Sequence, residues 1–282
     1  MARVALLTVH GMGSETAGYA DDLKAELRKR LKTKFGDLSF QSVFYQDILE
    51  PNERGYWSKV GGDLRWKDLR EFLLFGFADA SGLEANKEDP DSAYALAQVS
   101  IARAYLRAYQ DMGNTNGPVV VIAQSLGTQV MSNYLWDCQR KRNGQPVNEG
   151  IWADLPHYEV RIAGRPLASA EITALRAPNL RRFFTTGCNI PLFVAAHDLV
   201  IPIDRPVPEF EWHNYFDQDD VLGWPLGKLS DAYGQLVVDH PINVGGNLFD
   251  WLLKSWNPLA HTGYWSDGDV LDPLEAALRA FL

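Results

Sequence analysis

A short apolar run that leads directly into a serine limits the possible folds of this chain more than any other feature. Residues 119–123 read Val-Val-Val-Ile-Ala, which is typical of a strand buried on both faces of a parallel sheet. Gly117-Pro118 marks a turn before this run, and residues 128–136 have the spacing of a helix. Ser125 is therefore predicted to lie in a tight turn between a strand and a helix.

The residues two before and two after Ser125 are both small, namely Ala123 and Gly127. A strand and a helix can close on such a turn only if these two positions carry almost no side chain, and the turn then exposes the serine as a nucleophile. In the alternative interpretation, Ser125 only caps the helix that follows it.

A second glycine-rich turn follows an apolar run near the N-terminus. Residues 4–9 have the composition of a buried strand, and residues 10–13 read His-Gly-Met-Gly. Backbone N–H groups in such a turn can stabilise the oxyanion that develops during acyl transfer. We predict that the amides of Met12 and Leu126 form this oxyanion hole. A nucleotide-binding loop fits less well, because Thr16 stands where a third glycine is needed and the P-loop Lys-Ser/Thr is missing.

A serine nucleophile also needs a base and an acid. Histidine is the usual base because its pKa lies near neutral pH, and a carboxylate orients the imidazole and stabilises its charged form. When a serine stands in a turn of this type, the chain order is serine, acid, histidine. Ser125, Asp220 and His261 satisfy this order.

Two further blocks contain these candidates, residues 210–226 around Asp220 and residues 256–267 around His261. Together with the two glycine-containing turns, they resemble the α/β-hydrolase superfamily, in particular its bacterial esterase- and lipase-like members. The resemblance implies an α/β-hydrolase fold, which is a mostly parallel central sheet with helices on both faces and a helical cap insertion. It also implies that the two blocks carry the acid loop and the histidine loop.

Other residues compete for the acid and the base. Asp217 and Asp219 lie close to Asp220, and Asp198 follows an apolar segment at residues 192–197 that is predicted as a strand. The resemblance favours Asp220 because the whole block around it matches.

His240 competes with His261 as the base because it follows the apolar run at residues 236–239. We prefer His261 because Asn257-Pro258 and Gly263 place it in a loop. His197 stands next to the rival acid Asp198 and goes with it. Simpler structural interpretations apply to His10, in the first glycine-rich turn, and to His157 and His213.

The 282 residues are predicted to form one domain, 1–282, with a cap or lid insertion at about residues 49–93. This insertion is rich in aromatic residues, which fit a lid over an acyl pocket or ordinary core packing. Residues 140–177 are expected to form a loop excursion. The remaining predicted elements are helices at residues 17–31 and 273–282, the latter capped by Asp272, and strands at residues 40–45, 181–186, 210–216 and 236–239.

A formal charge of −9 argues against a nucleic-acid partner, which normally requires a basic surface. The sequence shows no apolar stretch long enough for a membrane span and no secretory leader, so we expect a cytoplasmic protein. Cys138 and Cys188 are expected to be free thiols. The predicted chemistry needs no cofactor and no metal, and the sequence has no His-Glu-x-x-His motif.

These observations predict a serine hydrolase that cleaves carboxylic esters through an acyl-enzyme intermediate. The expected partner is a small-molecule or lipid-like ester substrate. The same residues would also serve a thioesterase, an amidase or an acyltransferase, and a catalytically silent hydrolase fold used for binding is the alternative from another class. The sequence leaves the acyl chain length and the oligomeric state open.

Overall fold

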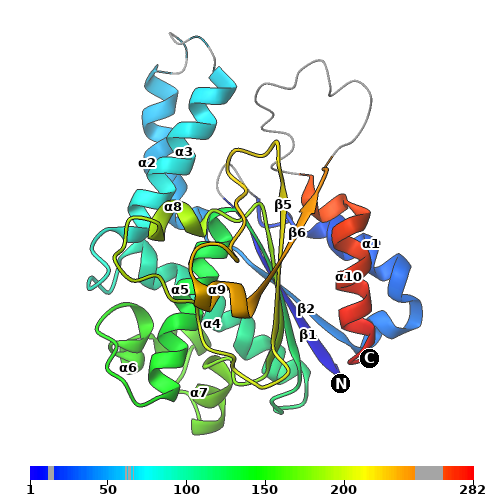
Figure 1. Cartoon of the computed structure of the whole chain (residues 1–282). Coiled ribbons are helices and arrows are strands. Elements are labelled where there is room, and N and C mark those ends of the chain that lie inside the picture. Colours follow the sequence, from blue (N-terminus) through cyan, green and yellow to red (C-terminus); the bar gives the residue numbers. More distant parts are fainter. Residues whose placement is uncertain (12–15, 61, 63–64, 66, 245–262) are drawn as a thin grey trace.

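The computed structural model describes residues 1–11, 16–60, 62, 65, 67–244 and 263–282. Within these ranges the chain forms a six-stranded sheet in the order β2-β1-β3-β4-β5-β6, in which every neighbouring pair is parallel (Figure 1). The strands are β1 (Val4–Val9), β2 (Leu38–Val43), β3 (Val119–Gln124), β4 (Leu180–Thr186), β5 (Glu211–Asp217) and β6 (Val237–Ile242). The predicted α/β class with a parallel sheet is thus confirmed.

Helices cover both faces of the sheet (Figure 1). One face carries α1 (Asp21–Leu31) and α10 (Gly268–Arg279), and the other carries α4 (Ala93–Asp111) and α5 (Leu126–Arg142). Around α4 lie η3 (Gly150–Trp152), α6 (Leu155–Ala163) and α7 (Ser169–Leu175). The remaining short elements are η1 (Lys32–Asp37), α8 (Ile190–Val194), α9 (Asp231–Leu236) and η5 (Tyr264–Ser266).

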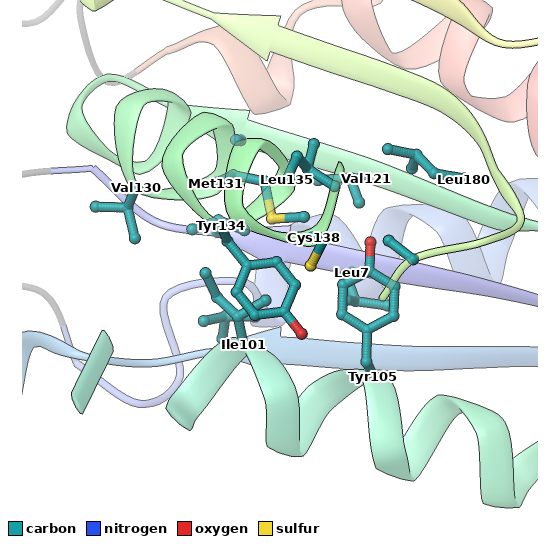
Figure 2. Packing of buried hydrophobic residues seen from close by; sticks show 14 of the residues in the cluster. Leu7, Ile101, Tyr105, Val121, Val130, Met131, Tyr134, Leu135, Cys138 and Leu180 are labelled. Carbon is teal, nitrogen blue, oxygen red and sulfur yellow. The ribbon is translucent and has the colours of Figure 1, made fainter. Parts of the chain in front are cut away.

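The apolar runs of β1 and β3 are buried on both faces because alternate side chains enter two separate cores. Leu7 and Val121 belong to the larger core, where Tyr105 of α4 and Tyr134 of α5 pack beside them (Figure 2). Leu6, in contrast, points to the smaller core under α1 and α10. Burial from both sides fixes the position of the loops at the carboxyl ends of these strands.

Several element predictions need correction. The segment at residues 192–197 is not a strand, since α8 spans Ile190–Val194 and Pro191 occupies its first turn, where proline favours a helix. Residues 140–177 contain η3, α6 and α7 as well as loops. The C-terminal helix begins at Gly268, because Asp267 caps it by accepting a hydrogen bond from the Asp269 amide, so Asp272 and Pro273 lie inside the helix.

The insertion predicted at about residues 49–93 contains two consecutive helices, α2 (Gln46–Val60) and α3 (Lys67–Glu84), which contact each other. Both extend past the carboxyl ends of the strands (Figure 1). None of the helices in the described part of the chain is both long and apolar enough to cross a membrane.

The strand order places a topological switch point between β1 and β3. From β1 the chain passes to β2 on one side, and it then returns to β3 on the other side of β1. In open parallel sheets, ligands bind in the crevice beyond the carboxyl ends of the strands at such a point. The loops that follow β1 and β3 begin with His10-Gly11 and Ser125, so these residues lie at the switch point.

Candidate active site

Ser125 has a backbone conformation that few residues adopt. It stands between the last residue of β3 and the first residue of α5, with φ 51° and ψ −126°. A positive φ is uncommon for a residue with a side chain, and such strain persists only where the surrounding structure enforces it, often at functional sites. The Ser125 amide donates to the Thr186 carbonyl at the end of β4, at 2.9 Å. The predicted tight strand-to-helix turn is therefore present.

Two glycines allow this turn to pack against the end of β1. A Cβ atom on Gly127 would lie 2.1 Å from the His10 carbonyl oxygen, and one on Gly11 would lie 2.8 Å from the Ser125 Cβ. Both distances are shorter than any stable contact, so larger residues would force the backbones apart. The two glycine-rich turns of the sequence thus meet at the switch point.

Helix capping does not explain Ser125. Its side chain makes no capping hydrogen bond to the first turn of α5, all of which lies in the described part of the chain. Leu126, the predicted oxyanion donor, opens α5, and N–H groups in the first turn of a helix have no partner within the helix. Met12, the other predicted donor, lies outside the described residues.

His10 braces the turn after β1 rather than offering a base. Its Nε2 accepts a hydrogen bond from the Tyr45 amide at 3.1 Å, so Nδ1 carries the proton and donates to the Gly11 carbonyl at 2.8 Å. The Tyr45 ring stacks on the imidazole, with 4.0 Å between centroids. Burial lowers the pKa of His10 to about 4, which keeps the ring neutral near pH 7.

Asp220 lies buried in the turn that follows β5. Its Oδ2 accepts a hydrogen bond from the Tyr264 hydroxyl at 2.8 Å, and its Oδ1 accepts one from the Leu222 amide at 2.9 Å. Gly223 packs so closely that an added Cβ would lie 2.7 Å from the Asp220 Oδ2. The carboxylate is therefore oriented by fixed donors, as the acid of a catalytic triad must be.

The competing carboxylates have other environments. Asp217 is buried, but its Oδ1 accepts from the Asp219 amide at 2.8 Å and its Oδ2 from the Val244 amide at 2.7 Å, so both oxygens bind backbone. Asp198 and Asp219 are exposed. These contacts give Asp217 a structural role, in which it ties the end of β5 to the chain that follows β6.

Asp239 on β6 holds the rest of the loop that follows β5. Its Oδ1 accepts from the Asn214 side-chain amide at 2.7 Å and from the Leu226 amide at 2.9 Å, while its Oδ2 accepts from the Gly227 amide at 2.8 Å. Asn214 also donates to the Trp224 carbonyl at 3.0 Å. The loop that contains Asp220 is thus fastened at both ends by carboxylates.

His261, the predicted base, lies outside the described residues. Its competitor His240 lies within β6, where its Nε2 is 3.0 Å from the His213 Nδ1 and its ring stacks on Tyr215. Burial, followed by the neighbouring His213, lowers the pKa of His240. A half-buried ring in a strand lacks the loop position that favoured His261. His157 and His197 are exposed.

Sequence reasoning missed the role of η5, whose residues contact two strand ends. Tyr264 reaches Asp220 after β5, and the Trp265 Nε1 donates to the Thr186 Oγ1 at the end of β4, at 3.1 Å. Thr186 is also the residue whose carbonyl accepts from the Ser125 amide. Both aromatic residues lie within the predicted histidine block at residues 256–267, but nothing in the sequence around them indicates these contacts.

A hollow of about 210 Å³ opens beside the contact between the two glycine-rich turns. Gly11, which packs against Ser125, and Gln124, which precedes Ser125, form part of its wall. The hollow offers room for part of a small molecule beside these two residues. The described residues that line it are His10, Gly11, Tyr19, Asp22, Leu23, Gln124, Trp265 and Ser266.

The two thiols do not offer an alternative nucleophile. Cys138 and Cys188 are both buried and unpaired, and burial raises the pKa of Cys188 to about 12. A thiol of this kind is inert because the thiolate is the nucleophilic form. The residues that the structure describes contain no cluster of three or more His, Cys, Asp or Glu side chains suited to a metal ion.

Comparisons with known proteins assign no family to this chain. No family model and no curated protein matches the sequence. Among solved structures, the chain is similar to one described as an iodinated complex of acetyl xylan esterase. The two share 12% sequence identity with a TM-score of 0.38, over 100% of this chain and 97% of the other.

Proposed function

We propose that this protein is a serine hydrolase that cleaves carboxylic esters through an acyl-enzyme intermediate. The observation that carries the proposal is the strained Ser125, with φ 51°, pressed against Gly11 at the switch point of a parallel sheet. Strain of this kind has no benefit for a helix cap, whereas it presents a serine hydroxyl at the carboxyl edge of the sheet, as a nucleophile requires.

In the proposed reaction, the Ser125 hydroxyl attacks the ester carbonyl while His261 takes its proton. Asp220 orients the imidazole, and the amides of Met12 and Leu126 stabilise the oxyanion. When the tetrahedral intermediate collapses, the bond to the alcohol breaks and His261 returns the proton to it. A water molecule then attacks the acyl-enzyme by the same steps, which releases the acid and restores Ser125.

The contact between Tyr264 and Asp220 supports the choice of acid and base. His261 stands only three residues before Tyr264 in the sequence, and the Tyr264 hydroxyl lies 2.8 Å from the Asp220 Oδ2. The proposed base is therefore close in sequence to a residue that contacts the proposed acid. His240, in contrast, is occupied by His213 and Tyr215.

The proposal includes an α/β-hydrolase fold with one domain over residues 1–282 and a cap at about residues 49–93. Its support is that α2 and α3 extend beyond the edge of the sheet at which Ser125 lies (Figure 1). A helical pair in this position would exclude water from a bound ester during the reaction.

The decisive experiment is labelling with a fluorophosphonate, which reacts with activated serines. We expect the wild-type protein to be labelled and Ser125→Ala to remain unlabelled with an unchanged melting temperature. Asp220→Asn and His261→Asn should each slow labelling by about 10³-fold or more, because the triad residues act as a unit. The matched control Asp198→Asn, which changes an exposed carboxylate, should leave the labelling rate unchanged.

Turnover of p-nitrophenyl esters from acetate to palmitate then defines the substrate. Hydrolysis of any member that disappears in Ser125→Ala supports the esterase. Labelling without ester turnover would indicate a thioesterase, an amidase or an acyltransferase. A wild-type protein that is not labelled at all would contradict the proposal and would favour the catalytically silent binding protein.

A further inference from the structure

The Tyr264 hydroxyl occupies a position that leaves only one direction for its proton. The side chain is fully buried, and its oxygen accepts a hydrogen bond from the Asp217 amide at 2.9 Å. Since that amide takes a lone pair, the hydroxyl proton points to the Asp220 Oδ2, 2.8 Å away. The phenol is therefore a dedicated donor to the carboxylate that we propose as the acid.

The surroundings hold this phenol in place. An added Cβ on Gly223 would lie 3.0 Å from the Tyr264 hydroxyl, so backbone closes one side of it. The adjacent Trp265 is hydrogen-bonded to the Thr186 Oγ1 at 3.1 Å, and the next element, α10, is anchored in the smaller core by Val270 and Leu274. Because both neighbours are fixed, the Tyr264 ring cannot shift if the Asp220 carboxylate moves.

The electrostatic environment keeps the hydroxyl protonated. Among the described residues, the charged groups that act on Tyr264 are Asp220, in the turn after β5, and Asp217, at the end of β5. Burial first, and then the negative charge of Asp220, raise the pKa of Tyr264 far above its usual value. The phenol therefore donates at every pH at which a hydrolase would work.

A donor in this position has two effects on a catalytic carboxylate. It fixes the rotamer, and it takes up part of the negative charge that would otherwise act on the imidazole. Hydrogen bonds to a charged group stabilise its charged form. The donor also weakens the effect of the carboxylate charge on a neighbouring imidazole, so the carboxylate raises the pKa of that imidazole less than it would without the donor. The donor thus adjusts the pH at which the base becomes able to accept a proton.

We propose that Tyr264 is a positioning residue of the hydrolytic site, which orients Asp220 and sets the lower pH limit of the reaction. This inference rests on the proposed function. It assigns to η5 a role in the chemistry in addition to its place in the chain just before α10.

The test is the second-order rate of fluorophosphonate labelling as a function of pH, which needs no knowledge of the natural substrate. In Tyr264→Phe the ring remains and the donor is lost. We expect the plateau rate to fall about tenfold, because small misplacements of catalytic groups have large effects on rate. The midpoint of the acidic limb should move up by about half a pH unit, because the carboxylate charge then acts more fully on the imidazole. In Asp220→Asn the midpoint should move down.

The matched control is Tyr134→Phe, which also removes a buried hydroxyl, one that donates to the Leu175 carbonyl in the larger core. It should change stability alone and leave the midpoint where it is. If Tyr264→Phe does not fold, Gly223→Ala disturbs the same hydrogen bond from the other side and should shift the midpoint in the same direction.

The outcomes separate the two proposals. If Ser125→Ala abolishes labelling, but Tyr264→Phe keeps the wild-type midpoint and plateau, the role of Tyr264 is wrong and the hydrolase stands. The same holds if Tyr134→Phe shifts the midpoint as much as Tyr264→Phe, because the shift would then reflect any lost hydroxyl. If Ser125→Ala is still labelled, the hydrolase proposal fails and the role of Tyr264 fails with it.

Discussion

The turn that contains Ser125 and the loop that contains Asp220 lie at the same edge of the sheet, but different forces hold them. The Ser125 turn is held by close packing of backbone, in which Gly11 and Gly127 leave no room for another atom. The loop after β5 is held by polar contacts, in which Asp217 and Asp239 accept hydrogen bonds from backbone amides. The first should respond to added volume, and the second to the loss of charge or of an acceptor.

The largest effect is expected from added volume at the Ser125 turn. Gly127→Ala places a Cβ 2.1 Å from the His10 carbonyl oxygen, so β1 and α5 must separate. We expect the free energy of unfolding in urea to fall by about 3 kcal/mol or more, which is the upper range for overpacked cores. The control is Gly36→Ala, because an added Cβ at Gly36 meets nothing within 4 Å. Equal stability of the two variants would show that the close approach is not needed.

The stability of the sterically held region around Ser125 should also depend on pH. Burial lowers the pKa of His10 from 6.5 to about 4. Between these two pKa values the imidazole binds a proton in the unfolded chain but not in the folded protein. The free energy of unfolding therefore has its full value above pH 6.5 and falls as the pH drops to 4. The loss should reach about 3 kcal/mol, at about 1.4 kcal/mol per pH unit.

Urea unfolding between pH 7.5 and 4 measures this loss. In His10→Gln, which keeps a side-chain acceptor but does not titrate, the fall in stability should be about 3 kcal/mol smaller than in the wild type. The exposed His157→Gln should retain the full wild-type fall. If His10→Gln also loses as much as the wild type, His10 is not the group responsible.

The polar region is tested by Asp239→Asn, which preserves size and replaces one acceptor oxygen by a donor. The amides of Leu226 and Gly227 would then share a single acceptor. We expect a loss of about 2 kcal/mol in the free energy of unfolding, in the range for a polar group left without its partner. Asp198→Asn, on an exposed loop, should lose nothing measurable. A similar loss in both variants would remove the contrast between the two regions.

The smallest effect is a gain. Ser125→Gly relieves a positive φ that costs a residue with a side chain about 1 kcal/mol, so the variant should be more stable by about that amount and inactive. Ser132→Gly, inside α5, should instead lose up to about 1 kcal/mol because glycine disfavours helices. Calorimetric melting temperatures of the two variants should therefore move in opposite directions.

The same contrast explains how far the sequence predicts the fold and the site. Steric requirements leave a local signature, because glycines must stand at fixed offsets from Ser125 and apolar runs must lead into the turns. This is why β1, β3 and the tight turn could be predicted. The distinction between helix and strand at residues 192–197 could not, because five apolar residues fit either structure and only Pro191 favours the helix.

The polar loop has no such local signature. Asp217 ends β5 and Asp220 follows it, and their roles differ in which distant groups they contact, Val244 in one case and Tyr264 in the other. Such pairings depend on the fold, so Asp239 and Tyr264 could not be found from their neighbours in the sequence. His261 and Met12 remain predictions, because both lie outside the described residues.

The placement of η5 also limits how this part of the chain can change. Tyr264 and Trp265 are adjacent in sequence, yet one is bound to the turn after β5 and the other to the end of β4. A residue inserted between them would rotate one ring away from its partner, whereas paired substitutions could preserve both contacts. In any family of related sequences, the spacing of these two aromatic residues should therefore be free of insertions and deletions, even where the loops on either side vary in length.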